Sequence, residues 1–206
     1  MQLGFYFDQT RCTACFACVV ACKDWHSVPP GPASWRRVTS IEKGNYPNLF
    51  VAHLSEGCHH CANPACTAAC PADAITKREA DGIVVVDQEA CLGRDGCGLC
   101  LDACPWDCPQ FGPEVNAKMQ KCDFCVDRLA EGKAPICAAS CPMRALEAGP
   151  LAELRARYPV SDAAEGFVHD ATTNPSILFK AKHDAAGLPI SRVDHTPTSP
   201  ATERIA

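Results

Sequence analysis

Apolar residues in this chain occur as short alternating runs separated by turn-forming residues, a pattern typical of small hairpins. The segments "SWRRVTSIE" (34–42) and "NLFVAHLS" (48–55) flank the turn-like "GNYPN". The segments "AIT" (74–76) and "IVVVD" (83–87) are joined through a turn at Asp81 and Gly82. Each pair predicts a two-stranded antiparallel hairpin. One further strand is predicted over "NPSILFKAK" (174–182).

Helices are expected to be short, because most helical segments lie between closely spaced cysteines and prolines. The four segments of this kind are "CVVACKDW" (18–25), "CTAAC" (66–70), "GLCLDAC" (98–104) and "FCVDRLAEG" (124–132). The segment "GPLAELRARYP" (149–159) is typical of an amphipathic helix. From about Ala186 the chain is polar and rich in proline, which predicts a disordered tail or an arm that wraps a partner.

Composition shows that cysteine, rather than a large apolar core, dominates the chain. The 206 residues include 17 cysteines and 17 prolines, and only 7% are aromatic. A cysteine share of about 8% is at the edge of the range that signals a cysteine-built scaffold. We therefore expect few long elements, in a fold organised around something other than a large apolar core.

Charge and hydropathy argue against nucleic acid as a partner and against a direct membrane span. The net charge is -5, whereas nucleic-acid binding needs a clustered basic surface. The longest apolar run lies in "GIVVVD" (82–87), and a span needs about twenty apolar residues. The start "MQLGFYFDQTRC" shows no signal peptide of its own. The expected location is cytoplasmic or peripheral on a membrane complex, or outside after export with a signal-bearing partner.

Sixteen of the cysteines form four groups of four, and each group ends in the spacing C-x3-C. Without a secretion signal, such patterns favour metal binding over disulfide bonds. The last cysteine of three groups is followed by proline, and Cys108 is left over. The groups are Cys12, Cys15, Cys18 and Cys22; Cys58, Cys61, Cys66 and Cys70; Cys91, Cys97, Cys100 and Cys104; and Cys122, Cys125, Cys137 and Cys141.

The spacing of the first group, C-x2-C-x2-C-x3-C, favours an iron–sulfur cube over zinc. Three cysteines spaced by two residues can curl around one cube, while the fourth points away from it. In two-cluster bacterial ferredoxins the fourth cysteine of such a run binds the other cluster. Zinc also takes four thiolates, often from two C-x2-C pairs, and a zinc-stabilised interaction protein is the remote alternative.

The third group allows two interpretations. In the first, Cys91 is the first ligand and "RDG" (94–96) is an inserted turn, since Asp-Gly suits tight turns. In the second, Cys97, Cys100 and Cys104 are the last three ligands and Arg94 stands where a first cysteine was lost. The second interpretation predicts a three-iron cluster or an unusual ligand. We favour the first, because "VVVDQEACLG" is a usual lead-in to a ferredoxin motif.

The layout resembles the four-cluster ferredoxin-type electron-transfer (beta) subunits of the dimethyl sulfoxide reductase family of molybdopterin oxidoreductases. The resemblance covers roughly residues 4–182, and the x11 spacing of the fourth group is its most telling feature. The motifs that carry it are "CTACFACVVACKDWH", "CHHCANPACTAACPADAITK", "DGIVVVDQEACLG", "CGLCLDACPWDCPQF" and "KCDFCVDRLAEGKAPICAASCPMRALEAG". The "RDG" insertion and Cys108 depart from the family pattern.

The resemblance implies an α+β, loop-rich fold with two ferredoxin-like two-cluster modules, short helices, small β-hairpins and a C-terminal extension. The implied modules are 1–30 with 110–150 and, separately, 58–109, with a hairpin insertion at 31–57 and a C-terminal helix, strand and tail at 151–206. The implied cofactors are four 4Fe-4S clusters. Their ligands would be Cys12, Cys15, Cys18 and Cys141 (site A); Cys22, Cys122, Cys125 and Cys137 (site B); Cys58, Cys61, Cys66 and Cys104 (site C); and Cys70, Cys91, Cys97 and Cys100 (site D).

The implied function is a relay of single electrons between a catalytic subunit, molybdopterin or tungstopterin in type, and a membrane anchor or other redox partner. No catalytic residue is then expected in this chain, and Cys108 is expected to be a buried thiol rather than a ligand. His59 and His60 could tune or ligate a cluster, but packing or contact with solvent is the favoured interpretation. Lys121 lies beside a ligand and could raise a cluster potential, or it could be a solvated surface charge. The alternative function is the same module serving a tungsten aldehyde oxidoreductase, a hydrogenase or an aromatic acyl-CoA reductase.

Overall fold

A computed structural model describes residues 1–194 of the chain and contains three small sheets with six short helices in that part. The strands are β1 (Leu3–Asp8), β2 (Arg36–Asn45), β3 (Asn48–Gly57), β4 (Ile75–Lys77), β5 (Val84–Val86), β6 (Leu146–Pro150), β7 (Ile177–Lys180) and β8 (Ile190–Asp194). The helices are α1 (Ala17–Trp25), α2 (Ala65–Ala68), α3 (Leu99–Asp102), α4 (Val126–Ala130), α5 (Ile136–Ala139) and α6 (Leu151–Arg157).

The first sheet joins segments from both ends of the sequence in the order β6-β1-β7. The central strand β1 pairs antiparallel with β6 and parallel with β7. All six residues of β1 are buried, since the strand has a neighbour on each edge. Phe5, Phe7 and Phe179 are at most 1% exposed and lie at the centre of the core. The sheet therefore holds the start of the chain, just before Cys12, against the segment that follows Cys141.

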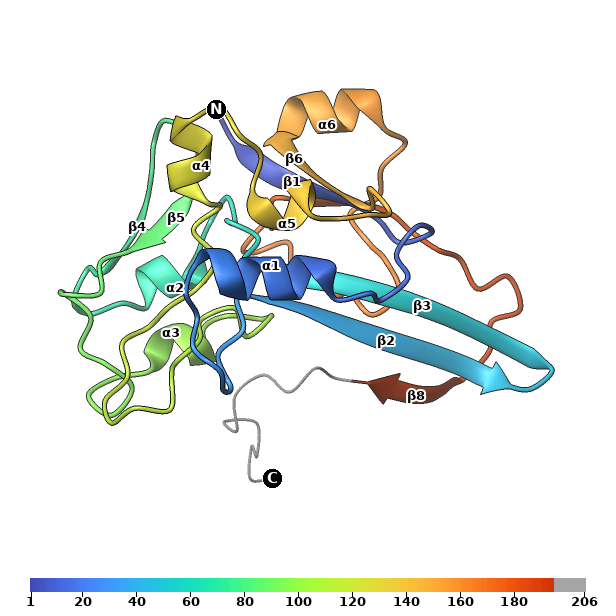
Figure 1. Ribbon diagram of the computed structural model, residues 1–206, viewed down its shortest axis with the longest axis horizontal. Coiled ribbons are helices and arrows are strands. Elements are labelled where there is room, and N and C mark those ends of the chain that lie inside the picture. The colour runs from blue at the N-terminus through green and yellow to red at the C-terminus, as the bar shows by residue number, and fades with distance from the viewer. Residues whose placement is uncertain (195–206) are drawn as a thin grey trace.

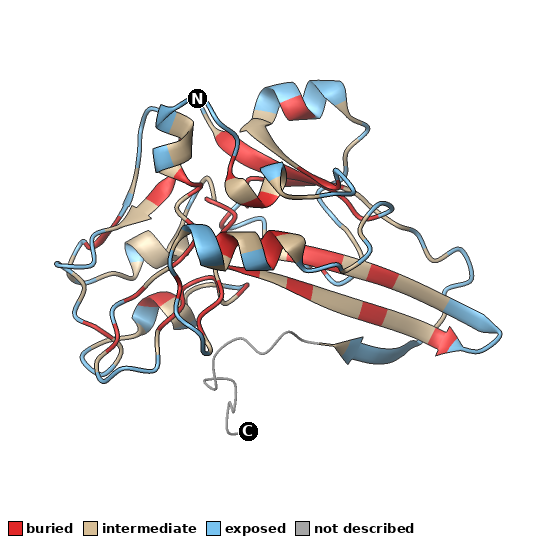
Figure 2. Ribbon diagram, viewed as in Figure 1, coloured by how far each residue is buried: buried red, intermediate tan, exposed pale blue. Residues whose placement is uncertain are grey.

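The predicted hairpin over 34–55 is confirmed as β2 and β3, which pair from Arg36 opposite Gly57 to Asn45 opposite Asn48. Its base is buried and its turn is exposed, so the hairpin projects from the body (Figures 1 and 2). The buried side chains Val38, Ile41 and Leu54 face the core. Helix α1 packs against β2 near this base.

The second predicted hairpin is confirmed as β4 and β5, and it lies with α2 and α3 at one end of the molecule (Figure 1). Its residues Ile75 and Val84 are buried in a second apolar cluster with Cys100 and Met119. This end contains the second and third cysteine groups. The chain is thus loop-rich and contains both helices and strands, in agreement with the α+β fold class expected from the sequence.

Each of the three Cys-Pro steps produces the same turn. Proline cannot donate an amide hydrogen and disfavours helix for the residue before it, so the helical turn ends there. The third residue after the cysteine has a left-handed backbone in each case: Asp73 (φ 50°), Asp107 (φ 48°) and Arg144 (φ 49°). Its amide donates to the carbonyl of the cysteine at 3.1–3.4 Å. These turns direct the chain away from each cysteine group.

Four elements of the structure were not predicted from the sequence: β1, β6, α5 and β8. Residues 186–194 were expected to be disordered or to form a partner-binding arm. Instead Ile190–Asp194 forms β8, which pairs antiparallel with β2 and completes a sheet of order β3-β2-β8. The rest of the predicted tail, 195–206, lies outside the described residues. Within residues 1–194, no helix has the length and apolar character that crossing a bilayer requires.

Candidate metal centres

Three of the four implied cysteine sets each line one cavity, together with apolar side chains. The site A cavity is lined by Cys12, Cys15, Cys18 and Cys141; the site C cavity by Cys58, Cys61, Cys66 and Cys104, with Cys108 as a fifth cysteine; and the site D cavity by Cys70, Cys91, Cys97 and Cys100. In each cavity, three cysteines of one group meet one cysteine of another group.

The site B cysteines are gathered where α1 packs against α5. Cys22 lies on α1 and Cys137 on α5, and both are buried with Cys122 and Cys125. Burial raises the pKa of Cys22 to about 12, and the neighbouring Cys137 and Cys125 add to this rise. The amide of Ile136, the residue before Cys137, donates to Cys125 Sγ at 3.4 Å and so joins the loop of Cys125 to α5.

Left-handed residues allow the cysteine loops to curl. Ala14 (φ 52°) and Phe16 (φ 60°) lie between ligand candidates of the first group, and His60 (φ 44°) lies in the second. Phe124 (φ 65°) and Cys125 (φ 51°) do the same in the fourth group. Such a backbone turns successive N–H groups toward one side, which makes a concave surface for an anion. The curled loops thus explain why closely spaced cysteines can face one space.

Backbone amides donate to cysteine sulfur at all four sites. These contacts measure 3.3–3.5 Å between nitrogen and sulfur, and they favour negatively charged sulfur. The donors and acceptors are Ala145 to Cys141 at site A, Phe124 to Cys122 and Ile136 to Cys125 at site B, Cys108 to Cys104 at site C, and Gly93 and Met119 to Cys91 at site D.

The chemistry of the donor sets fits an iron–sulfur cluster. None of the 17 cysteines is in a disulfide bond. Burial raises the pKa of Cys61 and Cys100 to about 12, so the thiols by themselves would keep their protons. A bound metal overcomes this penalty because it stabilises thiolate directly. Four sulfur atoms around one space, with amides aimed at sulfur, provide both the ligands and the hydrogen bonds that such a cluster takes.

In the third cysteine group, Cys91 rather than Arg94 faces the cavity of site D. The cavity is lined by Cys91, Gly93 and Gly98, with φ of 85° and 149° at the two glycines. The guanidinium of Arg94 lies instead over the ring of Phe111, 5.4 Å from its centroid. Phe111 belongs to the cavity lining, whereas none of residues 94–96 does.

Cys108 lies beside site C without completing its set of four sulfurs. It is 5% exposed, and its Sγ is 3.2 Å from the carbonyl oxygen of Gly57. Hydrogen bonding to Cys104 and Cys58 raises the pKa of Cys108 well above its ordinary value and lowers the pKa of Cys58 to about 5. Cys108 is therefore the thiol that keeps its proton in this trio, and thiolate is the form that binds metal.

Other residues singled out from the sequence are buried near sites B and C. His59 packs edge-on against Trp106 and Phe167, and His60 packs edge-on against Phe124, so both have the packing contacts expected of them. Lys121 is 3% exposed, which rules out the solvated interpretation. Its Nζ donates to the carbonyl oxygens of Val84 and Cys122, at 2.9 Å for the second.

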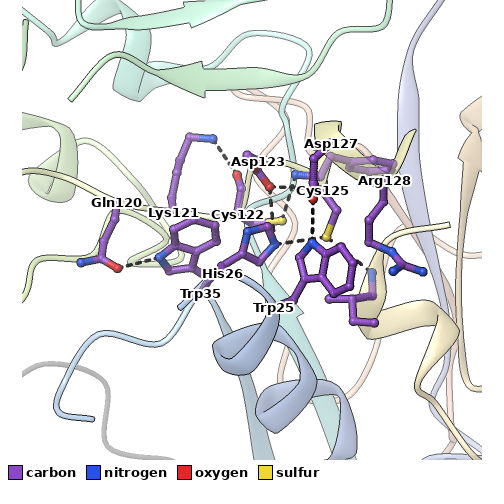
Figure 3. A network of polar contacts seen from close by, with 12 residues as sticks. Trp25, His26, Trp35, Gln120, Lys121, Cys122, Asp123, Cys125, Asp127 and Arg128 are labelled. Carbon is purple, nitrogen blue, oxygen red and sulfur yellow. Dashed lines mark hydrogen bonds and ion pairs between the residues drawn. The ribbon is translucent and has the colours of Figure 1, made fainter. Parts of the chain in front are cut away.

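Two residues near site B were not predicted from the sequence. His26 directs Nε2 toward Cys125 Sγ at 3.2 Å, and its ring packs on Trp35, whose Nε1 donates to Gln120 (Figure 3). The spacing of four residues from Cys22, along α1, is the sequence signal that could have identified His26. Arg36 is the second, and its place two residues before Val38 on a strand marks it as facing the core.

Comparison with known proteins agrees with these centres. Residues 49–151 match the family described as the 4Fe-4S dicluster domain. The chain is 43% identical to the iron–sulfur subunit of the anaerobic dimethyl sulfoxide reductase of Escherichia coli (strain K12) over 187 residues, which cover 87% of this chain and 88% of the relative. This chain belongs to that family of iron–sulfur subunits.

Two further relatives show the range of the family. The corresponding subunit of the anaerobic dimethyl sulfoxide reductase of Haemophilus influenzae is 38% identical over 188 residues, covering 87% of this chain and 89% of the relative. The formate dehydrogenase iron-sulfur subunit of Wolinella succinogenes is 40% identical over 169 residues, covering 72% and 81%. The chain is accordingly a non-catalytic electron-transfer subunit whose cofactors are 4Fe-4S clusters, and the zinc alternative is excluded.

Proposed function

We propose that sites A, B, C and D each hold one 4Fe-4S cluster and form a relay in that order. The observation that carries the proposal is that each cysteine set lies next to the following one in space, in the order A, B, C, D. Helix α1 bears Cys18 of site A and Cys22 of site B. Lys121 lines the cavity of site C, and its Nζ donates to the carbonyl oxygen of Cys122 of site B. Helices α2 and α3, which bear Cys66 of site C and Cys100 of site D, pack against each other.

The protein's own part in this relay is to set the potential of each site. A bound cluster supplies a centre that accepts and gives one electron without breaking a substrate bond. Amide donors, burial and nearby cations decide how readily each centre is reduced. Lys121 supports this role of nearby cations. Its charge lowers the pKa of Cys58, although less than the hydrogen bond from Cys108 does.

The same observations support two ferredoxin-like modules. Sites A and B draw their cysteines from 1–30 and 110–150, and sites C and D draw theirs from 58–109. The hairpin at 31–57 is the insertion between these parts, and 151–206 is the C-terminal extension. Each module would hold two clusters, with Cys22 and Cys141 exchanged between the first pair and Cys70 and Cys104 between the second.

The partners proposed for the two ends are a molybdopterin or tungstopterin catalytic subunit and a membrane anchor or other redox partner, with the chain peripheral to the membrane. Relatives named as reductase and dehydrogenase subunits support a catalytic partner. Exposed apolar side chains at both outer sites support docking there. Phe16 and Met143 at site A are 39% and 43% exposed, and Leu92 at site D is 49% exposed.

Iron and acid-labile sulfide in anaerobically purified protein test the relay. Four full clusters give about 16 of each per chain. About 15 irons with 16 sulfides would replace one 4Fe-4S cluster by a three-iron cluster, with site D the first to examine. Clearly lower sulfide, or zinc in place of iron, would overturn the proposal of four clusters.

Co-purification with the neighbouring gene products tests the partners. Phe16→Glu at site A should weaken retention of one partner, because it puts a charge into an apolar contact. Tyr46→Glu is the matched control, since Tyr46 is 93% exposed at the turn of the hairpin, away from both outer sites. Equal retention of every partner by the two variants would remove site A from the docking surface.

A further inference from the structure

The guanidinium of Arg36 is buried at the junction of sites A and B. Arg36 is the first residue of β2 and is 2% exposed. Its Cζ lies 4.8 Å from the centroid of the Phe5 ring, which closes one side. Opposite it, β3 ends in Gly57, where a Cβ would lie 2.9 Å from the carbonyl oxygen of Trp35 and 3.3 Å from Arg36 Nη2. Glycine at this position therefore leaves space for the guanidinium.

Helix α1 packs against β2, and it brings Cys18 of site A and Cys22 of site B to the strand that begins with Arg36. A buried cation without a counter-charge is strongly disfavoured. Burial lowers the pKa of Arg36, but Cys137, Cys18, Cys122 and Cys22 raise it above its ordinary value when they carry negative charge, as metal-bound cysteines do. Burial raises the pKa of the Glu56 carboxyl. The charges of Arg37 and, to a smaller extent, Arg36 lower that pKa. Among the four sulfurs, one belongs to site A and three belong to site B.

Ser55 extends this contact to one sulfur of site A. Arg36 Nη1 lies 3.2 Å from Ser55 Oγ and 3.5 Å from Ser55 O. Arginine can only donate, so Ser55 Oγ accepts from it. The Ser55 hydroxyl hydrogen can then point to Cys18 Sγ, which lies 3.5 Å from Oγ. A thiolate at Cys18 can only accept, so the order Arg36 to Ser55 to Cys18 is fixed for a metal-bound cysteine.

We propose that Arg36 is a positioning residue that raises the reduction potentials of the centres at sites A and B together, and that Ser55 adds a separate increment at site A. The inference rests on the proposed function, in which these sites hold clusters. Reduction adds one negative charge to a centre. A fixed positive charge in a poorly solvated position favours that form, and so does a hydrogen bond to a ligand sulfur. Because Arg36 lies near both sites, it shifts the two potentials in the same direction.

The test is a redox titration of the anaerobically purified chain, followed by EPR, after iron and sulfide have been measured in each variant. Arg36→Gln should lower two of the four midpoint potentials. At a fixed ambient potential the ratio of reduced to oxidised centre should fall about tenfold at both, which is about 59 mV for one electron. Ser55→Ala should lower one of the same two potentials by less. Arg36→Lys keeps the charge and should hold both potentials closer to wild type than Arg36→Gln does.

Arg37→Gln is the matched control, because Arg37 is the next residue of β2 and contacts the carbonyl oxygens of Trp106 and Asp107 instead. It should leave the two potentials moved by Arg36→Gln unchanged. A wild-type chain without clusters would overturn the proposed function. Full clusters with unmoved potentials in Arg36→Gln and Ser55→Ala would overturn only the present inference. If Arg36→Gln does not assemble its clusters, Arg36→Lys and Ser55→Ala test the inference. The inference is rejected if Ser55→Ala leaves every potential unchanged while Arg36→Lys, which keeps the charge, lowers two potentials.

Discussion

His26 Nε2 lies 3.2 Å from Cys125 Sγ, across the gap between the end of α1 and the start of α4. The same nitrogen is 3.7 Å from an oxygen of Asp123, and the imidazole ring packs on Trp35 with centroids 4.5 Å apart. Figure 3 shows the ring held between the tryptophan and the cysteine. A metal-bound Cys125 sulfur can only accept, so His26 Nε2 is placed to donate a hydrogen bond to it when site B is filled.

Replacing His26 by phenylalanine should lower the potential of one cluster while leaving iron content unchanged. Phenylalanine keeps the packing on Trp35 but removes the donor to Cys125, which leaves more negative charge on sulfur. The expected shift is on the order of 59 mV or less for a one-electron centre. EPR-monitored titration measures it. His53→Phe is the control, because His53 lies on β3 and contacts Ser40 at 2.9 Å, and an equal shift there would reject the explanation.

Cysteine substitutions should separate Cys91 from Cys108. Cys91 lines site D and accepts two amide hydrogens, whereas Cys108 retains its proton beside site C. Cys91→Ala should reduce iron below the value of about 16 per chain that four clusters require, by roughly one to four irons. Cys108→Ala should keep the full iron content. Unchanged iron in Cys91→Ala would favour the interpretation in which Arg94 replaces a lost ligand.

The hairpins could be predicted because their signals are local: alternation along 34–55 and 74–87, with a turn between the strands. Strand β1 could not, because its buried run "LGFYFD" gains its partners from β6 and β7, which lie near the other end of the sequence. Strand β8 was missed for a related reason. Its residues are mostly exposed and polar, and it forms by adding to the open edge of β2.

The residues of the candidate site also fall into those that could be predicted from the sequence and those that could not. The cysteine groups could be identified from spacing alone, since each loop closes locally around its own sulfurs. Spacing places His26 on the side of Cys22 and Arg36 on the core face of its strand, but it cannot give their roles, because these depend on which loop lies opposite each residue. Arg36 resembles an ordinary strand residue until β3 and α5 place sulfur and hydroxyl groups around it. Charge beside a metal site is a tertiary property, and it arises only once the chain is folded.

The carboxylate of Asp8 should make stability depend on acid pH. It accepts hydrogen bonds from Thr10 and forms an ion pair with Lys180 at 3.2 Å. Burial raises the pKa of Asp8, but these partners outweigh burial and lower it below the ordinary value of 3.8. A carboxyl whose pKa is lower in the folded state stabilises the fold above its unfolded pKa. That contribution is lost as the pH falls through the folded pKa.

Asp8→Asn should therefore reduce stability most at neutral pH, by about 1–3 kcal/mol, which is the range for hydrogen bonds to a charged group. The difference from wild type should shrink below about pH 4. Thermal unfolding followed by circular dichroism at several pH values measures this. Glu79→Gln, at an exposed position, is the control and should show no such pattern. A destabilisation of Asp8→Asn that stays constant from about pH 7 to about pH 3 would contradict the ionic explanation.

Gly4 and Gly149 face each other across β1 and β6, yet substitution to alanine should affect them differently. A Cβ on Gly4 would clash with the carbonyl oxygen of Ser176 and lie 2.6 Å from Leu151 Cδ1, whereas a Cβ on Gly149 would meet nothing within 4 Å. Gly4→Ala must force β1 away from the chain beside β7. Overpacking of this kind typically costs about 1–3 kcal/mol.

In a protein of this size, Gly4→Ala should lower Tm by about 2–4 °C for each kcal/mol, and Gly149→Ala should lie close to wild type. Because β1 ends at Asp8, just before Cys12, displacement of the strand should also disturb site A before the other sites. Iron content after mild heating should then fall in Gly4→Ala by one cluster first. Equal behaviour of the two variants would show that the close approach at Gly4 relaxes without moving the strand, and that site A does not depend on its position.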